Sequence, residues 1–229
     1  NISKDYLKYL NNESIQKINI LYKKDFELLN YEMINTFDTY FDKIYIINLD
    51  KDVKRKSDMI NQMIKYNINN YVFQKATSGI HIDKNEYIKN KEWAYPGNNF
   101  CNINNNCSCN GKGHELSVNE IALHLSHYHI WKDIIKNNYQ KCLILEDDCI
   151  FTENINTFNN IIPNIPSNWE LLYLGHSKKI NGSYGNNSIP INSNFNKLIT
   201  GINETHIYAI SYNCANILIN NMLPIRAAV

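Results

Sequence analysis

The sequence predicts an α/β protein with an open, mostly parallel sheet flanked by helices, preceded by an N-terminal helical extension. Short runs of apolar and β-branched residues alternate with segments of helical period, as they do in βαβ units. The remaining connections are long, polar and rich in Asn and Gly, and loops of that length in a compact domain often serve a function. With 229 residues, 44% of them hydrophobic, the chain has ample material for one core.

The N-terminal region is predicted to be a single amphipathic helix. Between residues 13 and 36, apolar residues recur at intervals of three and four, which places them on one helix face, with Asn12 or Ser14 as the cap. We expect residues 1–40 to form a helical extension and residues 41–229 the α/β domain. Since the chain opens without Met and stops soon after a helix-like stretch, we expect upstream and downstream domains in a longer protein.

The α/β domain is predicted to alternate strands and helices in a fixed order. A strand–helix–strand unit with parallel strands opens it, and a helix capped by Ser117, with Glu120 three positions later, precedes the third strand. Two loops, at residues 78–113 and 178–196, are expected to become ordered when a ligand binds. The predicted strands are at residues 43–49, 71–76, 141–148, 169–175 and 205–211, and the predicted helices at 53–66, 117–137 and 215–222.

The most informative segment is an apolar run that begins at Lys141 and ends in Glu146, Asp147 and Asp148. Alternation along a strand directs Glu146 and Asp148 to one side and Asp147 to the other. Two carboxylates held that close repel unless a cation lies between them, and Mg²⁺ and Mn²⁺ prefer carboxylate and phosphate oxygens. Because open α/β sheets bind ligands at strand carboxyl ends, the pattern favours a metal–diphosphate site. A solvated acidic turn is the alternative.

Charge and hydropathy argue against several other classes of protein. The formal net charge of +1 disfavours a nucleic-acid groove or an anionic membrane surface as the main partner. No apolar run approaches the length of a membrane span and no signal peptide opens the chain, which slightly favours a cytoplasmic location. Cys101, Cys107 and Cys109 share one loop, but their spacing differs from that of a zinc knuckle. A metal clip, a local disulfide and an ordinary thiol-bearing loop all stay open.

Five segments occur together in the order and spacing of one enzyme family. They are residues 46–50 with Lys54 and Arg55, residues 120–127 with Trp131, residues 143–148, residues 169–175 and residues 205–211. In these segments the chain resembles glycosyltransferase family 25, which includes lipopolysaccharide and procollagen galactosyltransferases. The resemblance covers roughly residues 43–225. It implies a GT-A fold, a UDP-sugar as donor substrate, and Mn²⁺ or Mg²⁺ as the metal.

The resemblance also implies roles for individual residues around the donor. Asp148 is expected to bind the metal, together with Glu146, which can also contact ribose or a metal-bound water. Donor contacts are expected from four further residues, with the Arg55 guanidinium pairing with phosphate; these residues are Asn48, Asp50, Arg55 and Ser78.

Three residues are candidates for the catalytic proton transfer. An inverting transfer needs a carboxylate or an imidazole to take the proton of the acceptor hydroxyl, and Glu204, His206 and His127 are the candidates. For His127 a core role is the alternative, since it lies on a helix that faces the sheet.

The chain departs from the family pattern at three places. Ser78 stands where an acid is common, which weakens a ribose contact there, and residues 203–204 stand where Gly is usual. The Asp that commonly follows the Leu-Pro-Ile segment is absent before Val229. We therefore expect that part of the family's active site, including a rival to Glu204, lies beyond this segment, and that the chain binds donor better than it transfers sugar.

The expected function is metal-dependent, inverting transfer of galactose or glucose from a UDP-sugar to a hydroxyl acceptor. A glycan and a collagen-like hydroxylysine are both plausible acceptors, because no residue distinguishes them. The alternative is a catalytically silent nucleotide-sugar-binding domain of a multidomain protein, which would not hydrolyse UDP-sugar. A nucleotidyltransferase would need a Gly-rich loop after the first strand, and residues 50–53 contain no glycine. A lectin is the weakest alternative.

Overall fold

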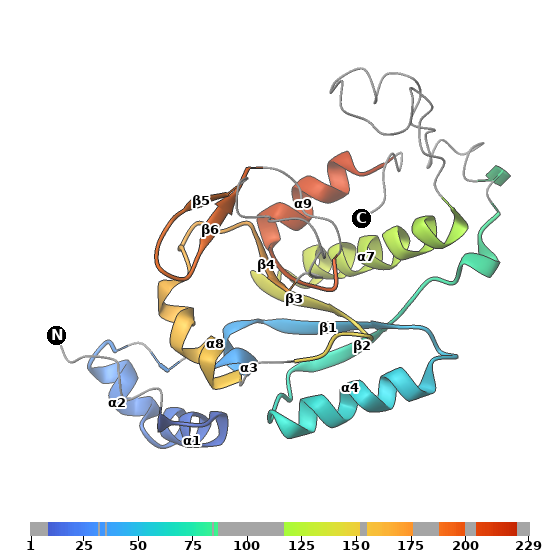
Figure 1. The fold of residues 1–229 in the computed structure, drawn as a ribbon. Helices are drawn as coiled ribbons and strands as arrows, with labels where there is room; N and C mark the ends of the chain where they lie inside the picture. The colour runs from blue at the N-terminus through green and yellow to red at the C-terminus, as the bar shows by residue number, and fades with distance from the viewer. Residues whose placement is uncertain are drawn as a thin grey trace.

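A five-stranded sheet forms the centre of the protein. The structure is a computed structural model of the chain, and it describes residues 9–31, 33–34, 36–83, 85–86, 117–151, 155–175, 188–199 and 205–223. Within these residues the strand order is β2-β1-β3-β7-β4, and helices cover both faces (Figure 1). The strands are β1 (Lys43–Asn48), β2 (Tyr71–Lys75), β3 (Lys141–Glu146), β4 (Leu171–Gly175) and β7 (Ile207–Ser211).

Strand direction brings distant segments to one edge of the sheet. β1 pairs in parallel with both β2 and β3, whereas β7 runs antiparallel to β3 and to β4. One strand, β7, therefore runs against the other four, which confirms the predicted open α/β sheet. Since β7 is reversed, its first residues lie at the same edge as the carboxyl ends of β1 and β3. Sequence pattern alone did not indicate that reversal.

Alternation along the buried strands divides the core into two layers. On one face, α4 (Val53–Lys65), α3 (Phe37–Tyr40) and α8 (Ile155–Ile161) cover the sheet, and on the other lie α7 (Val118–Asn137) and α9 (Tyr212–Asn221). The first layer includes Ile44, Ile46, Leu143 and Leu145 with Met59, Met63, Phe37 and Phe41. The second includes Tyr45, Ile47, Ile144 and Tyr208 with Ile130, Trp131, Ile134 and Ala215.

The capping of α7 agrees with the prediction. The Ser117 hydroxyl accepts a hydrogen bond from the Glu120 backbone N–H at 3.2 Å, and the Glu120 carboxylate accepts one from the Ser117 N–H at 2.7 Å. This capping box satisfies two N–H groups that the helix itself cannot pair. Asn138, with φ of 56°, ends the helix in the left-handed conformation. The start of α7 is thus fixed locally by the sequence.

Replacing Ser117 by alanine is expected to destabilise the protein by about 1 kcal/mol, because the N-terminal N–H of α7 loses its side-chain acceptor. Chemical denaturation of the two proteins measures the difference. Ser57→Ala is the matched control, since Ser57 is exposed within α4 and alanine is the better helix former there. An equal effect of the two substitutions would show that the capping box contributes nothing.

The predicted single helix over residues 13–36 is wrong. The structure has two shorter helices, α1 (Asn12–Leu21) and α2 (Lys23–Leu28), and the cap of α1 is Asn11, not Asn12 or Ser14. Asn30 adopts φ of 52°, which ends helical geometry. The chain then turns back, and the Asn19 side chain bonds both backbone groups of Ile34. The division at residue 40 stays a prediction.

The long loops contain local structure that the sequence pattern did not predict. β5 (Ser188–Pro190) lies in the second loop, and β6 (Asn196–Leu198) begins at its last residue; the two form a separate two-stranded antiparallel sheet. The first loop begins with the 3₁₀ turn η2 (Gly79–His81), and a second 3₁₀ turn, η3 (Ile162–Asn164), follows α8. The cysteine-rich loop and Glu204 lie outside the described residues. Across the described part of the chain, no helix has both the length and the apolarity needed to cross a bilayer.

Candidate functional site

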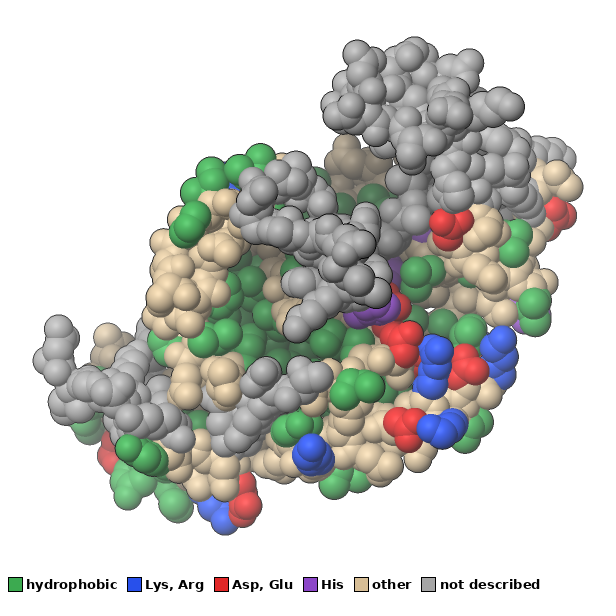
Figure 2. Space-filling view, in the orientation of Figure 1, with side chains coloured by type: hydrophobic (Ala, Val, Ile, Leu, Met, Phe, Trp, Pro, Cys, Tyr) green, Lys and Arg blue, Asp and Glu red, His purple; other side chains and the backbone are tan. Residues whose placement is uncertain are grey.

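Acidic side chains and a histidine meet where β3 ends and β7 begins. The Glu146 backbone N–H donates to the His206 carbonyl at 3.0 Å, which extends the antiparallel ladder one step beyond Leu145 and Ile207. Sixty residues apart in sequence, Glu146 and His206 are therefore neighbours in the fold. In the space-filling view, a histidine and acidic side chains reach the surface beside Lys and Arg side chains (Figure 2).

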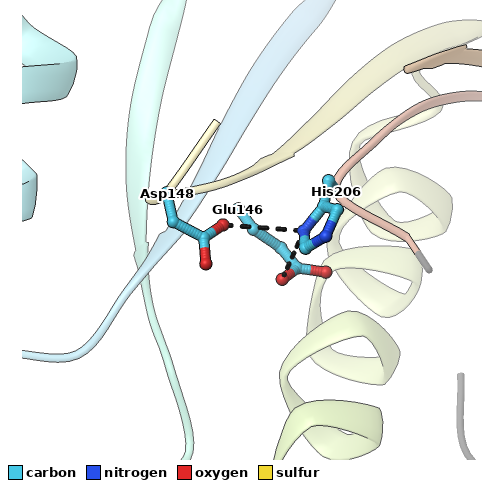
Figure 3. A group of neighbouring side chains, drawn as sticks. All are labelled: Glu146, Asp148 and His206. Atoms are coloured by element: carbon cyan, nitrogen blue, oxygen red, sulfur yellow. Dashed lines mark ion pairs between the residues drawn. The ribbon is translucent and has the colours of Figure 1, made fainter. Parts of the chain in front are cut away.

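Glu146, Asp148 and His206 form a compact cluster. The His206 Nδ1 atom lies 3.3 Å from a Glu146 carboxylate oxygen and 3.6 Å from an Asp148 carboxylate oxygen, and both carboxylates point toward the imidazole (Figure 3). One donor atom from each of the three residues lies within 4.8 Å of the others. The Thr205 hydroxyl donates to the second Glu146 oxygen at 2.9 Å, which orients that carboxylate.

Asp147 points away from the cluster. The predicted strand over residues 141–148 ends at Glu146, so Asp147 and Asp148 lie in the turn that follows β3. The two oxygens of Asp147 accept hydrogen bonds from the Asn48 amide at 2.7 Å and from Arg55 Nη1 at 3.0 Å. Arg55 Nη1 also lies 3.5 Å from Asp148. The hydrogen bond and the charge of Asp147 raise the pKa of Arg55 further above its usual value. Asp148 is thus placed between the imidazole on one side and the guanidinium on the other.

The donor chemistry of this cluster fits a divalent cation. Two carboxylates and an imidazole offer two oxygens and one nitrogen, a set that Mn²⁺ accepts and that is less suited to Mg²⁺, which prefers oxygen ligands. Glu146, Asp147 and Asp148 bring three negative charges to this group, and Arg55, which pairs with Asp147 and Asp148, brings one positive charge. A neutral imidazole, the form that binds a metal, leaves two negative charges uncompensated. A bound divalent ion would balance them and reduce the repulsion between Glu146 and Asp148.

His127 lies behind the site in a buried network. Its Nδ1 atom is 2.8 Å from the Tyr208 hydroxyl, which also accepts a hydrogen bond from the Trp131 indole at 3.1 Å. Since the indole can only donate, the tyrosine proton is available to His127 Nδ1. Burial lowers the pKa of His127 to about 3 and that of neighbouring His124 to about 4. Trp131 is buried.

The other predicted donor-binding residues, Asn48, Asp50 and Ser78, have different surroundings. Asn48 is buried, and its amide also donates to the Asp52 carbonyl at 3.3 Å. Asp50 is exposed and pairs with Lys75 at 2.5 Å. Ser78 directly precedes η2, where Gly79 is packed so closely against Asn119 of α7 that a Cβ would clash. Their roles stay predictions, as does that of Glu204, which the structure does not describe.

Two features of the site were not predicted from the sequence. Thr205 orients Glu146, and its position directly before His206 was the available signal. Asp147 accepts hydrogen bonds from Asn48, 99 positions away in the sequence, and from Arg55, 92 positions away. No local pattern indicates such contacts, because they depend on the parallel pairing of β1 with β3.

Acidic side chains at the strand ends of a mixed α/β sheet, with helices on both faces, are consistent with the class of GT-A-like proteins. The family model described as "Glycosyltransferase family 25 (LPS biosynthesis protein)" matches residues 41–229. The chain therefore belongs to glycosyltransferase family 25.

Relatives with assigned names match parts of the chain. Procollagen galactosyltransferase 2 of Homo sapiens is 25% identical over 142 residues, which is 60% of this chain and 21% of the relative. Procollagen lysyl hydroxylase and glycosyltransferase of Acanthamoeba polyphaga mimivirus is 25% identical over 202 residues, 80% of this chain and 20% of the relative. Inactive glycosyltransferase 25 family member 3 of Mus musculus is 30% identical over 73 residues, 30% of this chain and 12% of the relative. The matches thus span about a fifth or less of these relatives.

Proposed function

We propose that this domain transfers a hexose from a UDP-sugar to a hydroxyl acceptor, in a metal-dependent reaction that inverts the anomeric carbon. The observation that carries the proposal is the cluster of Glu146, Asp148 and His206, which lies at the strand ends where open α/β sheets commonly bind ligands. Galactose is favoured over glucose, because several relatives are named procollagen galactosyltransferase. For the same reason a collagen-like hydroxylysine is favoured over a glycan as the acceptor.

Asp148 and Glu146 are the proposed metal ligands, and His206 is the proposed third. When bound, the divalent ion would supply a Lewis acid that stabilises the diphosphate leaving group. Asp148 and His206 are both partly exposed, so a ligand can reach them. Arg55 lies on the other side of Asp148 and would pair with the diphosphate. Asn48, Asp50 and Ser78 are the further proposed donor contacts.

The transfer also needs a general base, which takes the proton of the hydroxyl group that receives the sugar. Burial of His127 and its hydrogen bond to Tyr208 argue for a supporting role and against direct contact with substrate. Glu204 is the proposed base within this chain, and His206 is the rival. The two roles of His206 are separable, because a metal ligand affects nucleotide affinity whereas a base affects only the transfer step.

A catalytically silent nucleotide-sugar-binding domain is the second candidate. The specific observation in its favour is that relatives from Mus musculus and Homo sapiens carry the name "Inactive glycosyltransferase 25 family member 3". The acids at the end of β3 would hold the nucleotide in either case. Metal-dependent hydrolysis of UDP-sugar separates the two candidates, since a silent domain shows none.

Titration calorimetry with UDP is expected to show at least a tenfold higher affinity in Mn²⁺ than in EDTA, a difference of about 1.4 kcal/mol. The cluster of two carboxylates and one imidazole is the physical reason. The same protein is then given UDP-galactose or UDP-glucose with a hydroxylysine peptide, and the product linkage is determined. Equal UDP affinity in the two buffers would contradict the proposed metal site. An α-linked product would contradict the proposed inverting mechanism.

A further inference from the structure

Asp147 is the most enclosed acid of the site and has no place in the metal cluster. Its side chain is 9% exposed, compared with 41% for Asp148. Each of its oxygens accepts one hydrogen bond, from Asn48 at the end of β1 and from Arg55 in the first turn of α4. Three separate segments, β1, α4 and the turn after β3, are therefore joined through one carboxylate.

The Arg55 guanidinium contacts the acids of the site through one of its three nitrogen atoms. Both of its contacts with the acids use the Nη1 atom, and the side chain is 53% exposed. A guanidinium carries five N–H donors in a rigid fork. The N–H groups on Nη2 and Nε therefore have no hydrogen-bond partner among the described residues. Such a half-engaged guanidinium is suited to bidentate binding of a phosphate.

We propose that Asp147 is a positioning residue, which fixes the Arg55 guanidinium through Nη1 so that its remaining N–H groups face the donor diphosphate. This inference rests on the proposed function. Free arginine side chains lose considerable conformational entropy when they bind a ligand, and a preformed ion pair removes part of that cost before the ligand arrives. The bond from Asn48 keeps the carboxylate itself from turning away.

A double-mutant cycle on UDP affinity in Mn²⁺ tests the proposal. Asp147→Asn and Arg55→Gln are each expected to weaken UDP binding about tenfold, or about 1.4 kcal/mol. The double variant is expected to lose about tenfold as well, because Asp147 acts through Arg55 and the two effects are not independent. A hundredfold loss in the double variant, the product of two separate effects, would overturn the proposal.

Binding of Mn²⁺ alone separates positioning from metal ligation. Asp147→Asn is expected to change Mn²⁺ affinity less than twofold, whereas Asp148→Asn weakens it strongly. A loss of Mn²⁺ affinity in Asp147→Asn as large as its loss of UDP affinity would make Asp147 a ligand and overturn the proposal. Asp58→Asn is the matched control, because Asp58 pairs with Lys54 on the exposed side of the same helix and its loss is expected to leave UDP binding unchanged.

Arg55→Lys keeps the proposal testable where Asp147→Asn fails to fold. Lysine retains the charge opposite Asp147 but lacks the planar fork, so it is expected to preserve stability and to lose most of the tenfold contribution to UDP affinity. Full UDP affinity in Arg55→Lys would overturn the proposed role of the fork. If the parent protein shows no Mn²⁺-dependent UDP binding, the proposed function itself fails. If the parent binds UDP but the losses in Asp147→Asn and Arg55→Gln are additive in the double variant, only the positioning role of Asp147 fails.

Discussion

Replacing Asp148 by alanine is expected to abolish the Mn²⁺-dependent part of UDP affinity and to lower sugar transfer by at least about 100-fold. Removal of partners that only orient metal ligands costs 10–100-fold, so loss of a ligand itself should cost no less. Asp148 lies on the turn after β3, between His206 and Arg55. The measurements are UDP titration in Mn²⁺ and in EDTA, together with initial rates of transfer.

The fold of the Asp148→Ala protein is expected to persist. Asp148 is partly exposed and contributes nothing to the two core layers, and its removal reduces repulsion among neighbouring carboxylates. Asp58→Ala is a useful comparison, because Asp58 is an exposed acid of α4 paired with Lys54 and has no proposed contact with the donor. Unchanged binding of UDP–Mn²⁺ by the Asp148→Ala protein would show that the metal site is wrongly assigned.

His206→Gln distinguishes the two roles proposed for the imidazole. As a metal ligand, His206 contributes to Mn²⁺-dependent UDP affinity, so that affinity should fall together with transfer. As a base, it would leave UDP affinity unchanged and lower transfer by about 10²–10⁴-fold. The position of Nδ1 between Glu146 and Asp148 favours the first result.

The strands and the direction of the acids could be predicted because both depend on local pattern. Ile46 and Ile47 face opposite layers of the core. Glu146 and Asp147 likewise point to different partners, His206 for the first and Asn48 and Arg55 for the second, although Asp147 already lies in the turn after β3. The capping box of α7 is equally local, since Ser117 and Glu120 are three residues apart. In each case the interaction that determines the structure lies within a few positions along the chain.

Contacts between distant segments could not be predicted from pattern. His206 reaches Glu146 only because β7 is reversed and inserted between β3 and β4, and strand order is a property of the whole sheet. The helix over residues 13–36 failed for a related reason. Its apolar period was genuine, but the tertiary bonds from Asn19 to Ile34 favour a turned-back chain over a continued helix, and Leu21 remains 76% exposed.

Lowering the pH from 7.5 to 5.0 is expected to destabilise the domain by a few kcal/mol, mainly through His124 and His127. In the unfolded chain each imidazole binds a proton with a pKa near 6.5. In the folded protein, burial lowers the pKa to about 4 for His124 and about 3 for His127. Between these values the unfolded state binds more protons, so stability falls as the pH falls below about 6.5 and is fully regained above it.

Urea denaturation at half-unit steps between pH 7.5 and 5.0 measures this dependence, and the lower limit keeps most carboxylates ionised. His124→Met is expected to remove about half of the dependence of the free energy of unfolding on pH. It should also cost little stability at pH 7.5, because neither His124 nitrogen has a hydrogen-bond partner within the described part of the chain and an unsatisfied buried polar group is itself unfavourable. His81→Gln is the control, since His81 is exposed on η2. A pH dependence that survives in the His124→Met, His127→Gln double variant would assign the acid sensitivity to other groups, and would show that the imidazoles of α7 are hydrated more than their burial implies.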